Sequence, residues 1–248
     1  DVGSGQRRTG AAVFAQHNTA LAIDAEVIHG HLTPTAIWSV TRHEGPVRAA
    51  KTVARKLLGF DAMFEARLRQ RLAIEDLGDP RGVCMDAMNL GLRDNSVDVC
   101  FSRCLFEHLP HPARATSELA RVLRPGGVLY VVANPFSGPL GAHDPDIMSQ
   151  TTPIDWAHLQ EEPTRKSASN AYLNEWTIAQ YTNMFSEQLP GSAIELWWPP
   201  DTELEDRIST LRRSGTLASF SDEELLAREV IAVWRKDEPA PASSEGCS

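Results

Sequence analysis

The sequence has no apolar run long enough for a transmembrane helix, and it shows no signal peptide. A helix that crosses a bilayer needs about 20 apolar residues, so no membrane span is expected. The chain also lacks an excess of basic residues. Its 33 acidic and 24 basic residues give a net charge of −9, and no cluster of Lys and Arg is interleaved with aromatic side chains. These absences argue against a nucleic-acid partner.

Cysteine is scarce, with four residues at positions 84, 100, 104 and 247. None forms a Cys-x-x-Cys pair or has a histidine at metal-ligand spacing, so no metal site is expected. Cys84 and Cys100 lie in apolar, strand-like runs and are predicted to be buried, reduced thiols. Reduced thiols and the lack of a signal peptide fit a cytoplasmic protein.

The chain is long enough for one sizeable core. With 248 residues and 42% hydrophobic content, we expect a single domain over residues 1–236. Residues 237–248 are rich in Pro, Ala, Ser and Glu and are predicted to be disordered.

The most informative segment alternates strand and helix. Residues 97–101 and 128–133 are short apolar runs, and between them lie an amphipathic helix near 112–123 and a predicted Pro-Gly-Gly turn. Continuous apolar runs are typical of parallel strands covered on both faces. Because ligands of open parallel sheets bind beyond the carboxyl ends of the strands, Ser102 becomes a candidate site residue.

Other segments complete an α/β pattern. Residues 6–16 predict a helix, and residues 20–24 and 82–85 predict strands that end near Asp24 and Asp86. Residues 27–79 form a helical insertion with helices near 48–58 and 62–72. This insertion is expected to cover the cofactor or substrate crevice or, alternatively, to provide a basic docking surface for an anionic substrate or partner. The last predicted strands, 194–198 and 230–234, are expected to form an antiparallel hairpin pair.

Four sequence motifs resemble those of class I S-adenosylmethionine-dependent methyltransferases, and within that family the type 11 small-molecule group. They are Asp1-Val2-Gly3-Ser4-Gly5, Asn95-Ser96-Val97-Asp98-Val99, Phe106-Glu107-His108-Leu109 and Glu118-Leu119-Ala120-Arg121-Val122-Leu123-Arg124-Pro125-Gly126-Gly127. The resemblance implies a Rossmann-like, mostly parallel seven-stranded sheet with the helical insertion after its second strand. In this family the glycine-rich motif follows the first strand, so that strand is expected to be largely missing and the chain truncated at its amino terminus.

The resemblance also implies S-adenosyl-L-methionine as cofactor. Asp24 would bind the ribose hydroxyls, and Asp86 and Ala87 would flank the adenine. The residues expected to bind the cofactor are Asp1, Gly3, Gly5, Asp24, Ala25, Asp86, Ala87 and Ser102.

The glycine-rich motif departs from two patterns. A dinucleotide fingerprint, Gly-x-Gly-x-x-Gly counted from Gly3, would need glycine at position 8, where the chain has Arg8. The dehydrogenase interpretation is therefore disfavoured. The methyltransferase family usually has a further glycine at position 7, where this chain has Arg7, and Gly10 could relieve helix packing instead.

Residues 136–190 are expected to supply the acceptor side, because long loops in compact domains are often functional lids. His143 is the preferred general base, with His158 in reserve and His108 as an alternative. The resulting prediction is methyl transfer to oxygen or nitrogen of a small polar molecule or a glycan unit. The alternative is a non-catalytic binding or regulatory subunit with the same fold. The oligomeric state is left open.

Overall fold

The computed structural model describes residues 1–5, 7–25, 33–159 and 172–238. The predicted tail from residue 239 onward and part of the expected acceptor segment lie outside these residues. The chain divides into two compact units, one with residues 1–91 and 101–103 and the other with residues 92–100 and 104–248. The single-domain boundary at residue 236 stays a prediction.

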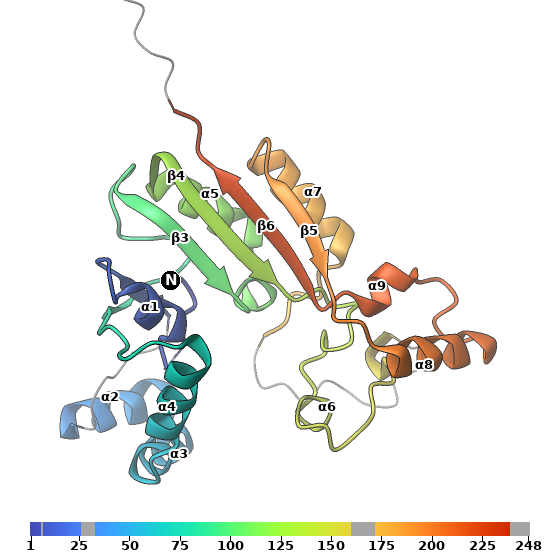
Figure 1. Cartoon of the computed structure of the whole chain (residues 1–248), viewed down its shortest axis with the longest axis horizontal. Coiled ribbons are helices and arrows are strands. Elements are labelled where there is room, and N and C mark those ends of the chain that lie inside the picture. Colours follow the sequence, from blue (N-terminus) through green and yellow to red (C-terminus); the bar gives the residue numbers. More distant parts are fainter. Residues whose placement is uncertain (6, 26–32, 160–171, 239–248) are drawn as a thin grey trace, which may run out of the picture. The chain divides into compact units, whose positions relative to one another are not determined.

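The first unit combines a two-stranded parallel sheet with helices, and Figure 1 shows these helices in blue and teal. β1 and β2 pair in parallel, with Asp24 opposite Cys84 at their carboxyl ends. The elements of this unit are α1 (Thr9–Phe14), β1 (Leu21–Asp24), α2 (Pro34–Glu44), α3 (Pro46–Leu57), α4 (Phe60–Leu72) and β2 (Arg81–Cys84). The predicted helical insertion therefore lies between β1 and β2, with α2 as a helix that the sequence analysis did not predict.

Val2 occupies the place expected for the first strand. It forms isolated parallel bridges to Ile23 of β1 and to Ser102, and its side chain is buried. Its N–H donates to the carbonyl of Phe101 at 2.8 Å, while the N–H of Gly3 donates to Ile23 at 2.9 Å. A short extended segment thus joins β1 to the end of β3 within this unit.

The second unit contains a four-stranded sheet in the order β3-β4-β6-β5. β6 pairs antiparallel with both β4 and β5. Its regular elements are β3 (Val97–Arg103, shared with the first unit), η1 (Phe106–His108), α5 (Pro112–Val122), β4 (Leu123–Ala133), α6 (Pro145–Met148), η2 (Ala157–Leu159), α7 (Ile178–Gln188), β5 (Ala193–Trp197), α8 (Thr202–Arg213), α9 (Asp222–Leu226) and β6 (Glu229–Arg235).

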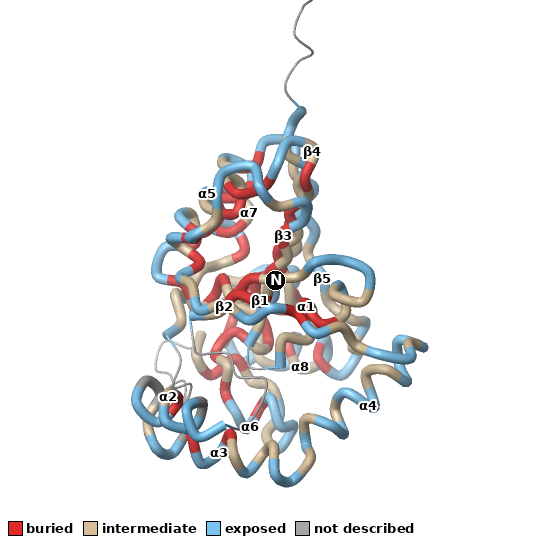
Figure 2. Tube along the Cα trace, turned by 90° about the vertical axis from the view of Figure 1, so that its left-hand side faces the viewer, coloured by how far each residue is buried: buried red, intermediate tan, exposed pale blue. Residues whose placement is uncertain are grey.

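The main core of the second unit lies between this sheet and two helices. α5 packs on β4, α7 packs on β6, and the two helices contact each other (Figure 1). Leu119 of α5, Phe185 of α7 and Val131 of β4 are each completely or almost completely buried. Figure 2 shows these buried stretches in red around α5, α7 and β4, whereas α4 of the first unit carries no buried residue.

Local signals account for several helix boundaries. Pro112 begins α5, where the missing N–H costs no hydrogen bond. Thr177 and Gln180 form a capping box at the start of α7. Ser221 and Glu224 form the same arrangement before α9, which packs with α8 around the buried Trp156.

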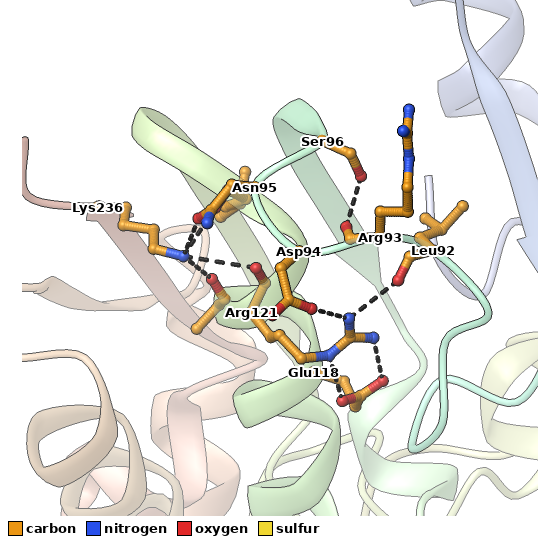
Figure 3. Close-up of polar contacts among 10 residues, drawn as sticks. Leu92, Arg93, Asp94, Asn95, Ser96, Glu118, Arg121 and Lys236 are labelled. Atoms are coloured by element: carbon orange, nitrogen blue, oxygen red, sulfur yellow. Dashed lines mark hydrogen bonds and ion pairs between the residues drawn. The ribbon is translucent and has the colours of Figure 1, made fainter.

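The carboxyl end of α5 is capped by a lysine (Figure 3). Nζ of Lys236 donates to the carbonyls of Ala120 and Leu123 at 2.8 Å each, and to Oδ1 of Asn95 at 2.9 Å. Arg121 pairs with Glu118 and with Asp94, at 2.8 and 2.6 Å. These contacts hold the turn before β3 against the helix end, where carbonyl groups lack partners within the helix.

The structure corrects several predictions. The described residues contain six strands, arranged as a parallel pair and a four-stranded sheet with antiparallel pairings, so neither seven strands nor a mostly parallel sheet is confirmed. The predicted Pro125-Gly126-Gly127 turn lies inside β4, which begins at Leu123, and Gly126 has the positive φ of 76° that such a turn requires. The last two strands are antiparallel as predicted, but α8 and α9 separate them, so they form no hairpin.

Two further predictions need correction. Cys100 is buried as expected, but Cys84 is exposed, because it ends a strand with three exposed residues. The first helix is shorter than residues 6–16 and begins at Thr9. Among the described residues, no helix has the length and apolar character needed to span a membrane.

Candidate functional site

The glycine-rich loop is fastened to the carboxyl end of β1. Gly3 and Gly5 have φ values of 75° and 60°, a left-handed conformation that glycine adopts without strain. The N–H of Gly5 donates to Oδ2 of Asp24 at 2.8 Å. A Cβ built on Gly5 would meet no atom of the other described residues within 4 Å, so in this part of the chain the loop presents bare backbone.

Asp1 connects the loop to the first helix. Its Oδ2 accepts a hydrogen bond of 2.9 Å from the N–H of Ala11, in the first turn of α1. Gly10 lies directly against this contact, since a Cβ there would lie 2.8 Å from Oδ2 of Asp1 and from the ring of Phe101. Gly10 therefore allows the close helix packing that the sequence suggested for it.

Arg7, which replaces the usual third glycine, points toward the insertion. Its Nε lies 3.4 Å from Oδ1 of Asp61 in α4, and its guanidinium lies 4.4 Å from the ring centre of Phe64. Arg55 of α3 contacts the same carboxylate at 3.0 Å. The arginine thus binds the insertion helices to the glycine-rich loop.

Two further strand ends complete one edge of the first unit. Asp86 and Ala87 follow β2, and the N–H of Met85 donates to the carbonyl of Asp24 at 3.0 Å. Oδ1 of Asp86 accepts from the N–H of Met88 at 2.8 Å, and Ala87 is buried. Ser102, next to Val2, is fully buried, and its hydroxyl has no hydrogen-bond partner among the described residues.

We call the set Gly3, Gly5, Asp24, Asp86 and Ser102 the strand-end rim. All its members belong to the first unit, together with Asp1, Ala25 and Ala87. The pairings of β2, β1, Val2 and residues 101–103 bring the predicted cofactor residues to one edge. Such an edge, beyond the carboxyl ends of parallel strands, is where open α/β sheets bind ligands.

The second unit contains another group of polar side chains, which we call the Glu/His cluster: Glu107, His108 and His143. One potential ligand atom from each lies within 4.8 Å of the others. Oε1 of Glu107 lies 3.8 Å from Nε2 of His143, and the two imidazole rings pack edge to face with centres 4.9 Å apart. The structure therefore brings together two of the three histidines proposed as bases.

Burial controls the charge of this cluster. It raises the pKa of Glu107 to about 7, although the backbone N–H groups of Glu107 and Asn134 act in the opposite direction. Burial, together with a smaller effect of nearby His108, lowers the pKa of His143 to about 4. The imidazole of His143 is therefore neutral near pH 7, and its contact with Glu107 is no ion pair.

His158 has different surroundings. Its Nε2 lies 2.9 Å from the carbonyl oxygen of Phe136, and its ring packs edge to face on the Phe136 ring. Burial lowers the pKa of His158, while the hydrogen bond to Phe136 opposes that change. Its contacts orient the chain around Phe136.

Asn174 is a residue whose role the sequence analysis did not predict. Its Nδ2 donates to the carbonyls of Phe106 and Leu109, at 2.8 and 3.0 Å, and so holds both ends of the η1 turn. Its Oδ1 accepts from Trp176 and Tyr181. Only the tertiary structure joins these segments, so no local sequence signal could have identified this role.

A glycine-rich loop close to an acidic residue at the end of the neighbouring strand is typical of the class of α/β proteins that bind nucleotide cofactors. Residues 44–131 match the family model described as a methyltransferase domain. An uncharacterized methyltransferase of Mycobacteroides abscessus is 44% identical over 68 residues, which is 27% of this chain and 26% of that protein. Another, from Mycobacterium sp. (strain JLS), is 37% identical over 86 residues, 35% of this chain and 33% of that protein.

These matches show that part of this chain, residues 44–131, is similar to methyltransferase domains. The chain spans about a quarter to a third of the length of these curated relatives. Among solved structures, the YcgJ protein of Bacillus subtilis superposes with a TM-score of 0.46 at 15% identity, covering 96% of this chain and 91% of that one.

Proposed function

We propose that this chain binds S-adenosyl-L-methionine along the strand-end rim. The observation that carries the proposal is the hydrogen bond from Gly5 to Asp24, which fixes a bare glycine backbone beside a carboxylate. Glycine lets a ligand approach the backbone closely, and a carboxylate accepts hydrogen bonds from two adjacent ribose hydroxyls. Asp86 and the buried Ala87 would then provide a polar acceptor and an apolar surface for the adenine.

The residues present fit such a group. Ser102 has a buried hydroxyl without a partner among the described residues, and buried polar atoms are normally satisfied. A polar ligand at this edge would supply the missing partner. Arg7 does not oppose this use of the loop, because its side chain is engaged with Asp61 and Phe64.

We further propose methyl transfer to oxygen or nitrogen of a small polar molecule or glycan unit. The sulfonium cofactor supplies an activated methyl group, so the protein has mainly to align the acceptor and exclude water. A neutral His143 can accept a proton from an acceptor hydroxyl, and this role is the one we propose for it, with His108 and His158 as alternatives. The segment 136–190 remains the proposed acceptor side.

The test has two parts. Calorimetry with S-adenosylmethionine, and separately with NAD⁺, establishes which cofactor binds. Transfer of a radioactive methyl group from S-adenosylmethionine to a panel of hydroxyl and amine acceptors then distinguishes an enzyme from a binding subunit. Cofactor binding without transfer to any acceptor would favour the non-catalytic alternative, and preferential binding of NAD⁺ would overturn the cofactor proposal.

A further inference from the structure

We propose that Glu107, His108 and His143 form a binding site for one divalent transition-metal ion. The inference depends only on the geometry of the second unit; it is independent of the cofactor proposal and is an alternative to the base roles of His143 and His108. No metal site was expected from the sequence, whose cysteines form no Cys-x-x-Cys pair and have no histidine at metal-ligand spacing. These three side chains come from η1 and from the loop before α6, and they meet only in the folded chain.

The distances between the potential ligand atoms are somewhat longer than those expected around a bound metal ion. Three donor atoms lie within 4.8 Å of one another, and the pair from Glu107 and His143 is 3.8 Å apart. Donors held about 2.0–2.1 Å from a tetrahedral ion lie about 3.4 Å apart. To reach that spacing, the Glu107–His143 pair would have to close by about 0.4 Å, and a pair at the 4.8 Å limit by about 1.4 Å.

The buried carboxylate is the second observation that points to a ligand. The Glu107 side chain is only 5% exposed, and neither of its oxygens has a hydrogen-bond partner of good geometry among the described residues. A carboxylate removed from water without such partners is costly. A bound dication would compensate that cost directly.

The ring of His108 is already oriented by a second partner. Its Nδ1 lies 2.9 Å from the carbonyl oxygen of Tyr172. Because a carbonyl only accepts, Nδ1 carries the proton and Nε2 keeps its lone pair. Histidines that bind metals commonly have this arrangement, in which a backbone carbonyl fixes the tautomer and the ring.

The donor set indicates the class of ion. Two imidazole nitrogens and one carboxylate oxygen suit Zn²⁺, Fe²⁺ or Co²⁺, whereas Mg²⁺ and Ca²⁺ prefer oxygen donors. Three protein ligands leave at least one coordination position open, as in catalytic sites and unlike closed structural sites. An ion here would use the lone pairs that His143 and His108 need as bases, so the metal and base roles exclude each other.

Metal titration of the full chain tests the proposal. After dialysis against EDTA, Zn²⁺ is titrated by calorimetry, and Co²⁺ binding is followed by visible absorption. We expect one equivalent of ion to bind. Glu107→Gln and His143→Gln should each weaken Zn²⁺ binding by about 100-fold or more, since losing a mere outer-shell partner costs 10–100-fold. The matched control is His111→Gln, an exposed histidine close to the cluster in sequence.

Each outcome decides the matter. Lost binding in both cluster variants and normal binding in His111→Gln would support the site. No stoichiometric binding to the wild-type chain would overturn it, and so would binding that both cluster variants retain. Thermal melting without metal shows whether each variant folds. If Glu107→Gln does not fold, the test uses His143→Gln, whose side chain is the more exposed of the two, and the Co²⁺ spectrum of that variant. S-adenosylmethionine binding in EDTA is measured in parallel, so that failure of the metal site and of the cofactor proposal can be told apart.

Discussion

The backbone N–H of Gly5 and Oδ2 of Asp24 are joined by a hydrogen bond of 2.8 Å, although the residues are 19 positions apart. The contact links the glycine-rich loop to the end of β1. It also means that Asp24 has two tasks in the proposed function, since the same carboxylate would orient the loop and bind the ribose. Substitutions of Asp24 can separate these tasks.

Asp24→Ala should weaken S-adenosylmethionine binding by about 10-fold or more, because hydrogen bonds to a charged group contribute about 1.5–3 kcal/mol. The affinity of Asp24→Asn for S-adenosylmethionine should lie between those of Asp24→Ala and the wild type, since the amide oxygen of asparagine can still accept the hydrogen bond from Gly5. Calorimetry measures both affinities. Asp206→Asn, on the exposed side of α8, is the control. Unchanged affinity in Asp24→Ala would show that the ribose assignment is wrong.

Gly78→Ala should destabilise the first unit. A Cβ at Gly78 would lie 2.4 Å from the carbonyl carbon of Ala15 and 2.6 Å from its oxygen, so backbone atoms must move. We expect a loss of about 1–3 kcal/mol in the free energy of unfolding, measured by urea denaturation. Gly91→Ala is the matched control, because its nearest neighbour is a Met85 atom 4.0 Å away. Equal stability of the two variants would contradict the predicted clash.

Asn174→Asp should loosen the η1 turn that carries Glu107 and His108. Aspartate keeps the acceptor for Trp176 and Tyr181 but loses the two donors to Phe106 and Leu109. The loss of these two hydrogen bonds should lower the free energy of unfolding by up to about 3 kcal/mol for each carbonyl left without a partner. Thermal unfolding measures the effect, with the exposed Asn89→Asp as control. Identical melting of both variants would show that this clamp contributes nothing.

The strands that the sequence predicted best are those with continuous apolar runs. Residues 20–24, 82–85 and 97–101 correspond closely to β1, β2 and β3, because each is a short, mainly apolar run with turn residues at its ends. The sequence did not predict that Pro125-Gly126-Gly127 would lie within a strand, and the cause is tertiary. The N–H of Gly126 donates to the carbonyl of Lys236 and the N–H of Lys236 to that of Gly127, so pairing beyond β6 extends β4 through this segment.

The two candidate sites also differ in how far they could be predicted from the sequence. The strand-end rim was predictable, since its residues follow strands whose ends a parallel sheet aligns. The Glu/His cluster was only half visible, because Glu107 and His108 adjoin in sequence but His143 reaches them through the folded loop. The burial of Glu107 and His143, which shifts their pKa values, also results from tertiary packing and cannot be predicted from a local sequence pattern.

Cys100 should resist alkylation while Cys84 and Cys104 react. Burial raises the pKa of Cys100 to about 11, so at pH 8 only about a thousandth of it is the reactive thiolate. Cys84 and Cys104 are exposed. Iodoacetamide labelling followed by peptide mass spectrometry measures each site, and labelling in urea is the control that should make all three react. Labelling of native Cys100 as fast as Cys84 would contradict its buried position.

Lys236→Met should lower the free energy of unfolding of the second unit. Methionine retains much of the aliphatic chain but removes the ammonium that donates to Ala120, Leu123 and Asn95 (Figure 3). These acceptors include carbonyls at the end of α5, where a cation is also favoured by the helix dipole. We expect a loss of about 1–3 kcal/mol, because the interactions involve a charged donor in a partly buried position.

Urea denaturation measures this loss, and Lys51→Met is the matched control. Lys51 is an exposed lysine of α3, so its replacement should change stability by no more than about 0.5 kcal/mol. A fall in both variants would point to a general effect of charge, because the chain carries a net charge of −9 and each substitution removes one cation. A fall in Lys236→Met alone would instead identify the cap of α5 as the cause, since only that position combines the charge with three specific acceptors.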